Sequence, residues 1–125
     1  MNDRHLVVIA ALTLMVGVGA GAFGAHGLKT ILSADMLTVW QTAVLYQMIH
    51  GLGILGIAAL VAHRPDKRFI TSALLMIVGI LMFSGSLYIL ALSGLRVLGA
   101  ITPIGGIAFI AGWGLLAFAA LRPPR

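Results

Sequence analysis

Residues Trp40–His50, WQTAVLYQMIH, decide the fold, because they place three polar side chains inside a segment apolar enough to cross a membrane. At about 100° per residue of helix, Tyr46, Gln47 and His50 fall within roughly one third of the circumference. At about 1.5 Å per residue, His50 lies roughly 15 Å below the level of the Trp40 indole, near the middle of a hydrocarbon core about 30 Å thick. An ionisable residue at that depth indicates a functional site.

The composition of the chain is that of a membrane protein. Its 125 residues are 61% hydrophobic and 9% charged, and the mean hydropathy is +1.12. A net charge of +5 would suggest nucleic acid in a soluble protein, but here the basic residues lie in short connections and near the C-terminus. There they fix topology and contact anionic lipid head groups. We expect a single membrane domain over residues 1–125, with membrane lipids as partners and no nucleic acid.

Four apolar runs are long enough to span a bilayer, at about residues 6–25, 39–62, 69–92 and 99–121. They predict an all-α membrane fold, a four-transmembrane-helix bundle with short loops. The first run follows a charged start, as a secretory signal peptide does, but its length favours an uncleaved helix. Phe23 and Phe83, and Thr42 and Thr102, recur at one spacing, which suggests a parallel repeat of two hairpins.

The basic residues predict the orientation of the bundle. Six lie on the side of the termini and the middle loop and two on the other side: Arg4, Arg64, Lys67, Arg68, Arg122 and Arg125, against Lys29 and Arg96. Positive charge in short loops is retained in the cytoplasm. We therefore expect a bacterial inner-membrane protein with both termini in the cytoplasm.

Glycines mark the faces where helices approach closely. Gly17 and Gly21 form a G-x-x-x-G step, which we interpret as packing within the chain rather than a dimer face. In the segment Thr102–Gly106, Pro103 is expected to begin a helix and the glycines to allow a close crossing. An anion-binding helix start is the alternative there. The glycines expected at helix contacts are Gly17, Gly21, Gly24, Gly85, Gly105 and Gly106.

With this orientation, polar side chains gather in the outer half of the membrane or near its midplane. We expect a polar cluster shared by the second and third spans, facing the bundle interior: Tyr46, Gln47, His50, Ser84 and Ser86, with His26 nearby. Two interpretations of His50 remain open, a neutral imidazole that joins helices through hydrogen bonds and a functional group. For His26, we expect it to cap the end of its own helix.

Chemistry that needs several ligands or an acid is absent from the predicted spans. Two histidines with no intramembrane carboxylate or cysteine fall short of a metal site. The three acids, Asp3, Asp35 and Asp66, lie at ends or in loops, so no carboxylate base lies within the membrane. We expect a non-enzymatic protein without a cofactor or metal.

Four blocks of the chain together resemble one family: GAFGAHGL (21–28), WQTAVLYQMIHGL (40–52), FSGSLYILALSG (83–94) and ITPIGGIAFIAGW (101–113). It is the YgdD/YwdK-like family of small inner-membrane proteins, a family of unknown function with relatives in animals. The resemblance covers nearly the whole chain and implies a four-span membrane protein, with no activity attached. It carries over, without roles, Phe23, Gly24, His26, Trp40, Tyr46, Gln47, His50, Ser84, Gly85, Ser86, Tyr88, Pro103, Gly105, Gly106 and Trp113.

Three functional hypotheses follow from these patterns. The first is a membrane protein that binds a small or lipidic ligand, or a partner helix, in a polar pocket in the outer half of the bundle. The second is an oligomeric channel or carrier for a small solute or for protons. In the proton case, His50 would carry the proton. The third is an assembly factor for a larger membrane complex, for which glycine-rich faces are suited.

Overall fold

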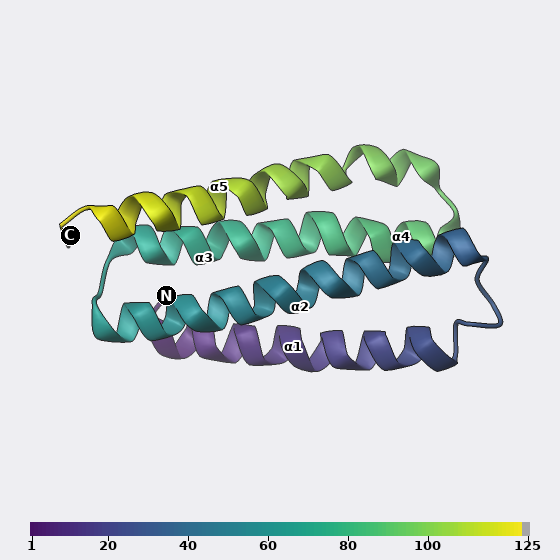
Figure 1. Ribbon diagram of the computed structural model, residues 1–125, viewed down its shortest axis with the longest axis horizontal. Coiled ribbons are helices and arrows are strands. Elements are labelled where there is room, and N and C mark those ends of the chain that lie inside the picture. The colour runs from purple at the N-terminus through teal and green to yellow at the C-terminus, as the bar shows by residue number, and fades with distance from the viewer. Residues whose placement is uncertain (124–125) are drawn as a thin grey trace.

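The computed structural model describes residues 1–123 and is a bundle of four long helical rods (Figure 1). Each rod is long and apolar enough to cross a membrane, and the described residues contain no strand, so the predicted four-helix membrane fold is confirmed. The first two rods are single helices, α1 (Asp3–His26) and α2 (Ala34–His63). The other two are compound: α3 (Lys67–Gly79), the π-helical turn η1 (Ile80–Ser84) and α4 (Gly85–Ser93), then the 3₁₀ turn η2 (Arg96–Ala100) and α5 (Thr102–Leu121).

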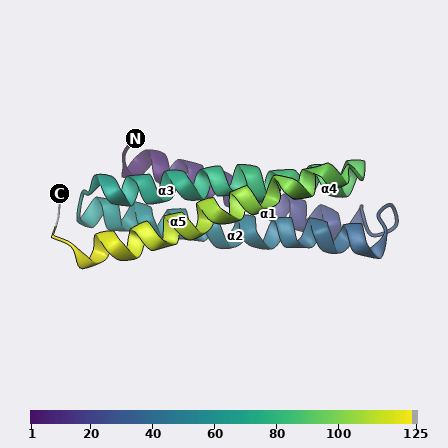
Figure 2. The ribbon, with the colours of Figure 1, turned by 90° about the horizontal axis from the view of Figure 1, so that it is seen from above.

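The rods form two antiparallel hairpins. The main contacts of α1 are with α2, and those of α5 are with α3 and η1, while α2 joins the hairpins through α3, η1 and α4. The first hairpin contains the first two spans and the second contains the last two, which are the two halves that a parallel repeat would relate. The start of α1 and the end of α5 lie at one end of the bundle in the two views of Figures 1 and 2, here called the terminal end. Arg125, counted above with the basic residues of that side, lies outside the described residues.

The second rod begins earlier than hydropathy indicates, at Ala34 rather than at residue 39. The Ser33 hydroxyl accepts a hydrogen bond from the Met36 N–H at 3.2 Å and so caps the helix, and polar residues can continue a helix beyond the apolar core. The connection from α1 is therefore short. At the first rod, Asn2 and His5 form a capping box, which places the helix start at Asp3 rather than at residue 6.

Small residues of α1 lie against α2. A side chain at Gly17 would meet Met48, one at Gly21 would meet Val44, and one at Gly24 would meet the Trp40 ring. Trp40 is only 7% exposed, so it packs inside the hairpin. Its indole N–H donates to the Ala20 carbonyl at 2.9 Å.

At Gly105, α5 crosses the third rod at the π-helical turn. A Cβ on Gly105 would overlap the backbone nitrogen of Phe83, whereas one on the adjacent Gly106 would meet only the Phe83 ring, at 3.9 Å. Gly85, expected at a helix contact, makes no comparable approach, since its Cβ would meet only the Ile80 carbonyl at 4.0 Å. In the turn itself the Gly85 N–H donates to Ile80 O, a wider step than that of an α-helix.

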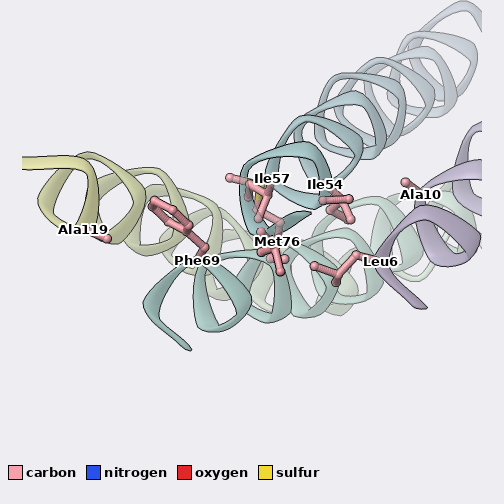
Figure 3. Packing of buried hydrophobic residues seen from close by; sticks show 10 residues of the cluster. Leu6, Ala10, Ile54, Ile57, Phe69, Met76 and Ala119 are labelled. Carbon is pink, nitrogen blue, oxygen red and sulfur yellow. The ribbon is translucent and has the colours of Figure 1, made fainter. Parts of the chain in front are cut away.

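The largest apolar cluster fills the terminal half of the bundle (Figure 3). Leu6, Ile54, Ile57 and Met76 are almost completely buried there. Since the cluster draws on α1, α2, α3 and α5, it joins all four rods at that end. Most polar contacts between rods are consequently found at mid-height and towards the opposite end.

Candidate functional site

The polar face of α2 meets different neighbours on its two edges. Taking Tyr46 as the origin, His50 lies about 40° and Gln47 about 100° around the helix. Gln47 contacts α1 and α4, whereas His50 contacts α5. The structure therefore divides the cluster that the sequence predicts between two sides of α2.

Gln47 joins three helices. Its side-chain NH₂ donates to the Thr13 carbonyl of α1 at 2.9 Å, and its side-chain oxygen accepts from the Tyr88 hydroxyl of α4 at 2.6 Å. The residue is 5% exposed. Both of its polar ends are paired inside the bundle, and this satisfies them where no water is available.

Ser84, Ser86 and His26 do not come together in one site. Ser84 is completely buried and donates to the Ala43 carbonyl of α2 at 2.7 Å. The Ser86 hydroxyl lies 2.7 Å from the Thr102 hydroxyl and donates a hydrogen bond to the Phe83 carbonyl. His26 is exposed at the end of α1. The structure thus does not bring His26 to His50.

His50 is held in one tautomer by its two partners. A carbonyl only accepts, so the Nδ1–H must donate to the Tyr46 carbonyl, at 2.8 Å. Nε2 then accepts from the indole N–H of Trp113 at 3.0 Å. The ring lies parallel to Phe109, with centroids 3.6 Å apart. Both nitrogens are occupied, and a proton added to Nε2 would face the indole N–H, donor against donor.

Two grooves flank α2. The larger, with a volume of about 500 Å³, runs between α2 and α5 and has Phe83 of η1 in its wall. We call it the α2–α5 groove; its walls include Tyr46, His50, Phe83, Gly106, Phe109 and Trp113. The smaller, about 340 Å³, lies between α1 and the third rod. We call it the α1–α4 groove; its walls include Leu12, Thr13, Val16, Gln47, Leu81 and Tyr88.

The residues that line both grooves come from the middle of the helices rather than from one end. The sequence predicts a single pocket, whereas the structure has one groove on each side of α2. The difference arises because Ser86 and Thr102 pair with each other near the opposite end, and because Gln47 and Ser84 are used in helix contacts. What stays open to the surface is a mid-height recess on each side of α2.

Tyr46 lines the α2–α5 groove, and its hydroxyl has no partner among the described residues. Its ring packs against Phe83, with centroids 4.4 Å apart, but its O–H makes no hydrogen bond to any residue within 1–123. Thr13, in the α1–α4 groove, also lacks a side-chain hydrogen bond among the described residues. A threonine hydroxyl can rotate onto a carbonyl of its own helix, whereas a tyrosine hydroxyl is held too far from its own backbone to do so.

The comparisons identify the family. The family described as "Protein of unknown function (DUF423)" matches residues 20–106. This chain belongs to the DUF423 family. A UPF0382 membrane protein of Staphylococcus saprophyticus is 50% identical over 113 residues, which are 90% of this chain and 93% of the relative.

Two further relatives cover almost all of the DUF423 chain. UPF0382 membrane protein YwdK of Bacillus subtilis is 44% identical over 95% of this chain and 98% of its own. UPF0382 inner membrane protein YgdD of Escherichia coli is 41% identical over 100% of this chain and 95% of its own. The resemblance to the YgdD/YwdK-like family is thereby confirmed, as is a multi-pass membrane protein. No solved structure is significantly similar to the chain.

Sequence reasoning missed a charged cluster at the terminal end of the DUF423 protein. Asp66 is 3% exposed and binds Arg68 through both carboxylate oxygens, at 2.8 and 3.0 Å, and Arg64 at 3.3 Å. Arg64 also donates to the Ala119 carbonyl at 2.8 Å, and Arg68 to the Pro123 carbonyl at 2.7 Å. Residues 63–68 (HRPDKR), which join α2 to α3, therefore clamp the end of α5. The acid between basic residues was the available signal.

Ser72 is a second residue that the sequence reasoning missed. It is completely buried in α3 and donates to the Gly112 carbonyl of α5. The terminal half of the bundle thus holds a buried hydrogen bond between α3 and α5 in addition to the charged cluster. A small residue at position 112 allows this contact, since a Cβ there would lie 3.1 Å from the Ser72 carbonyl.

The clamp should make stability fall in acid. Hydrogen bonds from the Arg68 side chain hold the pKa of the Asp66 carboxyl well below its usual value of 3.8; the Arg68 N–H and Arg64 act in the same direction, while burial opposes them. A lowered folded pKa contributes stability that is present above the unfolded value and is lost as the pH falls towards the folded one. The melting temperature in detergent should therefore decline below about pH 4.

The control for this pH dependence is Asp66→Asn, which cannot ionise. It should melt at a lower temperature than the wild type at pH 7 and lose most of the dependence below pH 4. A variant that keeps the wild-type melting temperature at pH 7 would show that the clamp contributes nothing.

Proposed function

We propose that this DUF423 protein is a non-enzymatic inner-membrane protein that binds a lipidic ligand in the α2–α5 groove. The observation that carries the proposal is a mid-height recess of about 500 Å³ with aromatic walls, one of which, Tyr46, has a hydroxyl without a partner among residues 1–123. Ligand pockets usually have volumes of about 300–1,000 Å³, apolar walls and a few polar groups that orient the ligand.

The position of the groove favours a ligand that arrives through the bilayer. Its walls come from the middle of α2 and α5, at the level of the hydrocarbon core, where water is absent. An unpaired hydroxyl is costly in hydrocarbon. A ligand that is lipid-soluble and carries an acceptor would remove that cost, whereas a solute from water would first have to cross part of the membrane.

The residues give less support to catalysis or proton transport. Asp3, Asp35 and Asp66 lie at or outside the ends of the rods, so neither groove has a carboxylate base. His50 already uses both nitrogens, and a proton relay through it would first have to break the contact with Trp113. Binding a ligand without a reaction requires neither a carboxylate base nor a proton relay.

Filling the groove tests the proposal. In Gly106→Leu, the new side chain would enter the α2–α5 groove, because Gly106 lines it and a Cβ there meets only the Phe83 ring at 3.9 Å. Gly114→Leu is the matched control, since a Cβ at Gly114 meets nothing within 4 Å and Gly114 does not line the groove. Native mass spectrometry of protein released from membranes should show a bound lipidic molecule in wild type and in Gly114→Leu.

In Gly106→Leu the bound fraction should fall by about tenfold or more, because burying an isobutyl group in the recess excludes a ligand of similar volume. Equal retention by all three proteins would overturn the proposal. So would the absence of any bound lipid from the wild type when the protein is released in the mildest detergent that keeps it folded.

We further propose that both termini lie in the cytoplasm. The terminal end carries Arg4, Arg64, Lys67, Arg68 and Arg122, whereas the opposite end carries Lys29 and Arg96. A green fluorescent protein fused to the C-terminus should therefore fluoresce, and alkaline phosphatase fused there should be inactive. A fusion after Lys29 in the connection between α1 and α2 should give the reverse pattern, and active phosphatase at the C-terminus would refute this orientation.

A further inference from the structure

We propose that the ligand of the α2–α5 groove carries a flat conjugated ring with an acceptor oxygen, as prenylated quinones do, and is not a plain acyl chain. This inference rests on the proposed function and names the class of ligand. It follows from a comparison of the two grooves, from the arrangement of the rings and from the Tyr46 hydroxyl, which has no partner among residues 1–123.

The two grooves differ in the chemistry of their walls. The α1–α4 groove is mainly aliphatic, with Leu12, Val16 and Leu81 beside Tyr88. The α2–α5 groove has five rings in its walls, those of Tyr46, His50, Phe83, Phe109 and Trp113. Aromatic walls offer an acyl chain no stacking contact. The mainly aliphatic α1–α4 groove is available to such a chain on the other side of α2.

Three of the five rings in the groove walls share nearly one orientation, whereas Phe83 is tilted by 39° to Tyr46 and Trp113 by 55° to His50. Tyr46 and His50 lie within 11° of parallel, with centroids 6.0 Å apart. His50 lies parallel to Phe109, and Tyr46 lies within 20° of Phe109. Three rings that share nearly one orientation favour a ligand that is itself flat, because offset stacking needs near-parallel planes.

The polar groups of the groove leave one position for a hydrogen bond. His50 and Trp113 are paired with each other, which leaves the Tyr46 hydroxyl without a partner among residues 1–123. A phenol donates one hydrogen bond, so the complementary group is an acceptor such as a ring carbonyl. A saturated chain offers no such atom, whereas a quinone carries two carbonyls in the plane of its ring.

The two tryptophans of the chain provide the test. Trp113 lines the groove and Trp40 is buried between α1 and α2, so Trp40→Phe leaves a reporter in the groove and Trp113→Phe leaves one outside it. Each variant is reconstituted in phosphatidylcholine and phosphatidylglycerol nanodiscs and titrated with decylubiquinone, which quenches tryptophan at short range. Dodecanoic acid and a phospholipid with brominated chains serve as probes without a ring.

We expect saturable quenching of Trp113 by decylubiquinone and only a weak linear effect on Trp40. In the Trp40→Phe background, Tyr46→Phe should weaken the binding roughly two- to tenfold, the equivalent of one hydrogen bond. Gly106→Leu should abolish saturation and Gly114→Leu should not. Dodecanoic acid should compete poorly.

Two outcomes would overturn the inference, and they are distinguishable. If dodecanoic acid displaces decylubiquinone equally well and Tyr46→Phe has no effect, the groove binds acyl chains, and only the ring is rejected. If Gly106→Leu changes the quenching of Trp113 neither by decylubiquinone nor by brominated lipid, the groove holds no ligand, and the proposed function fails with the inference.

Discussion

Replacing Gly105 by alanine should lower the free energy of unfolding by about 1–3 kcal/mol, the usual cost of overpacking a tight contact. The added Cβ would overlap the backbone nitrogen of Phe83, and a backbone atom in a helix cannot move aside as the end of a flexible side chain can. Relief would require α5 and the third rod to separate where they cross at the π-helical turn. Unfolding in mixed micelles with increasing dodecyl sulfate, followed by circular dichroism, measures the change.

Gly106→Ala is the matched control because it makes the same chemical change one residue later. Its Cβ would be in ordinary contact with the Phe83 ring at 3.9 Å. Alanine favours a helix over glycine by roughly 0.5–1 kcal/mol, so this variant should be unchanged or slightly more stable. Equal losses at both positions would contradict the close crossing at Gly105.

Replacing His50 by leucine should cost about 1–3 kcal/mol, because it leaves the Trp113 indole N–H without its acceptor in a region without water. Leucine keeps much of the volume but loses the parallel contact with Phe109. The same detergent titration measures this loss. We expect this loss because His50 is hydrogen-bonded to the Tyr46 carbonyl on its own helix and to the Trp113 indole on α5.

A double-mutant cycle with Trp113→Phe separates the hydrogen bond from the packing. If the His50–Trp113 bond stabilises the fold, the double variant should lose less than the sum of the single losses, by roughly 0.6–1.7 kcal/mol. Strict additivity would show that the two side chains do not interact. A His50→Leu protein more stable than wild type would show that the imidazole is retained at a cost, for function alone.

The spans and the polar face of α2 could be predicted because each depends on one periodic property. Hydropathy over about twenty residues locates a helix in a bilayer, and a repeat of 3.6 residues places Tyr46, Gln47 and His50 on one face. Neither property says which neighbour meets each edge of that face. His50 therefore turned out to contact α5 and Gln47 to contact α1 and α4.

Two other features depended on tertiary contacts that the local sequence does not determine. Trp40 near a helix start is typical of an interfacial residue, but Gly24 of α1 leaves room for its ring inside the hairpin. The pairing of Asp66 with Arg64 and Arg68 depends on how the loop folds back to α5, which charge spacing alone does not determine.

The most direct test of the central claim is a crystal structure of the wild-type protein grown from a lipidic phase. We expect non-protein electron density in the α2–α5 groove, in contact with Phe109 and within hydrogen-bond distance of the Tyr46 hydroxyl. A groove closed by direct packing of α2 against α5, with the Tyr46 hydroxyl bonded to another residue of the chain, would contradict it.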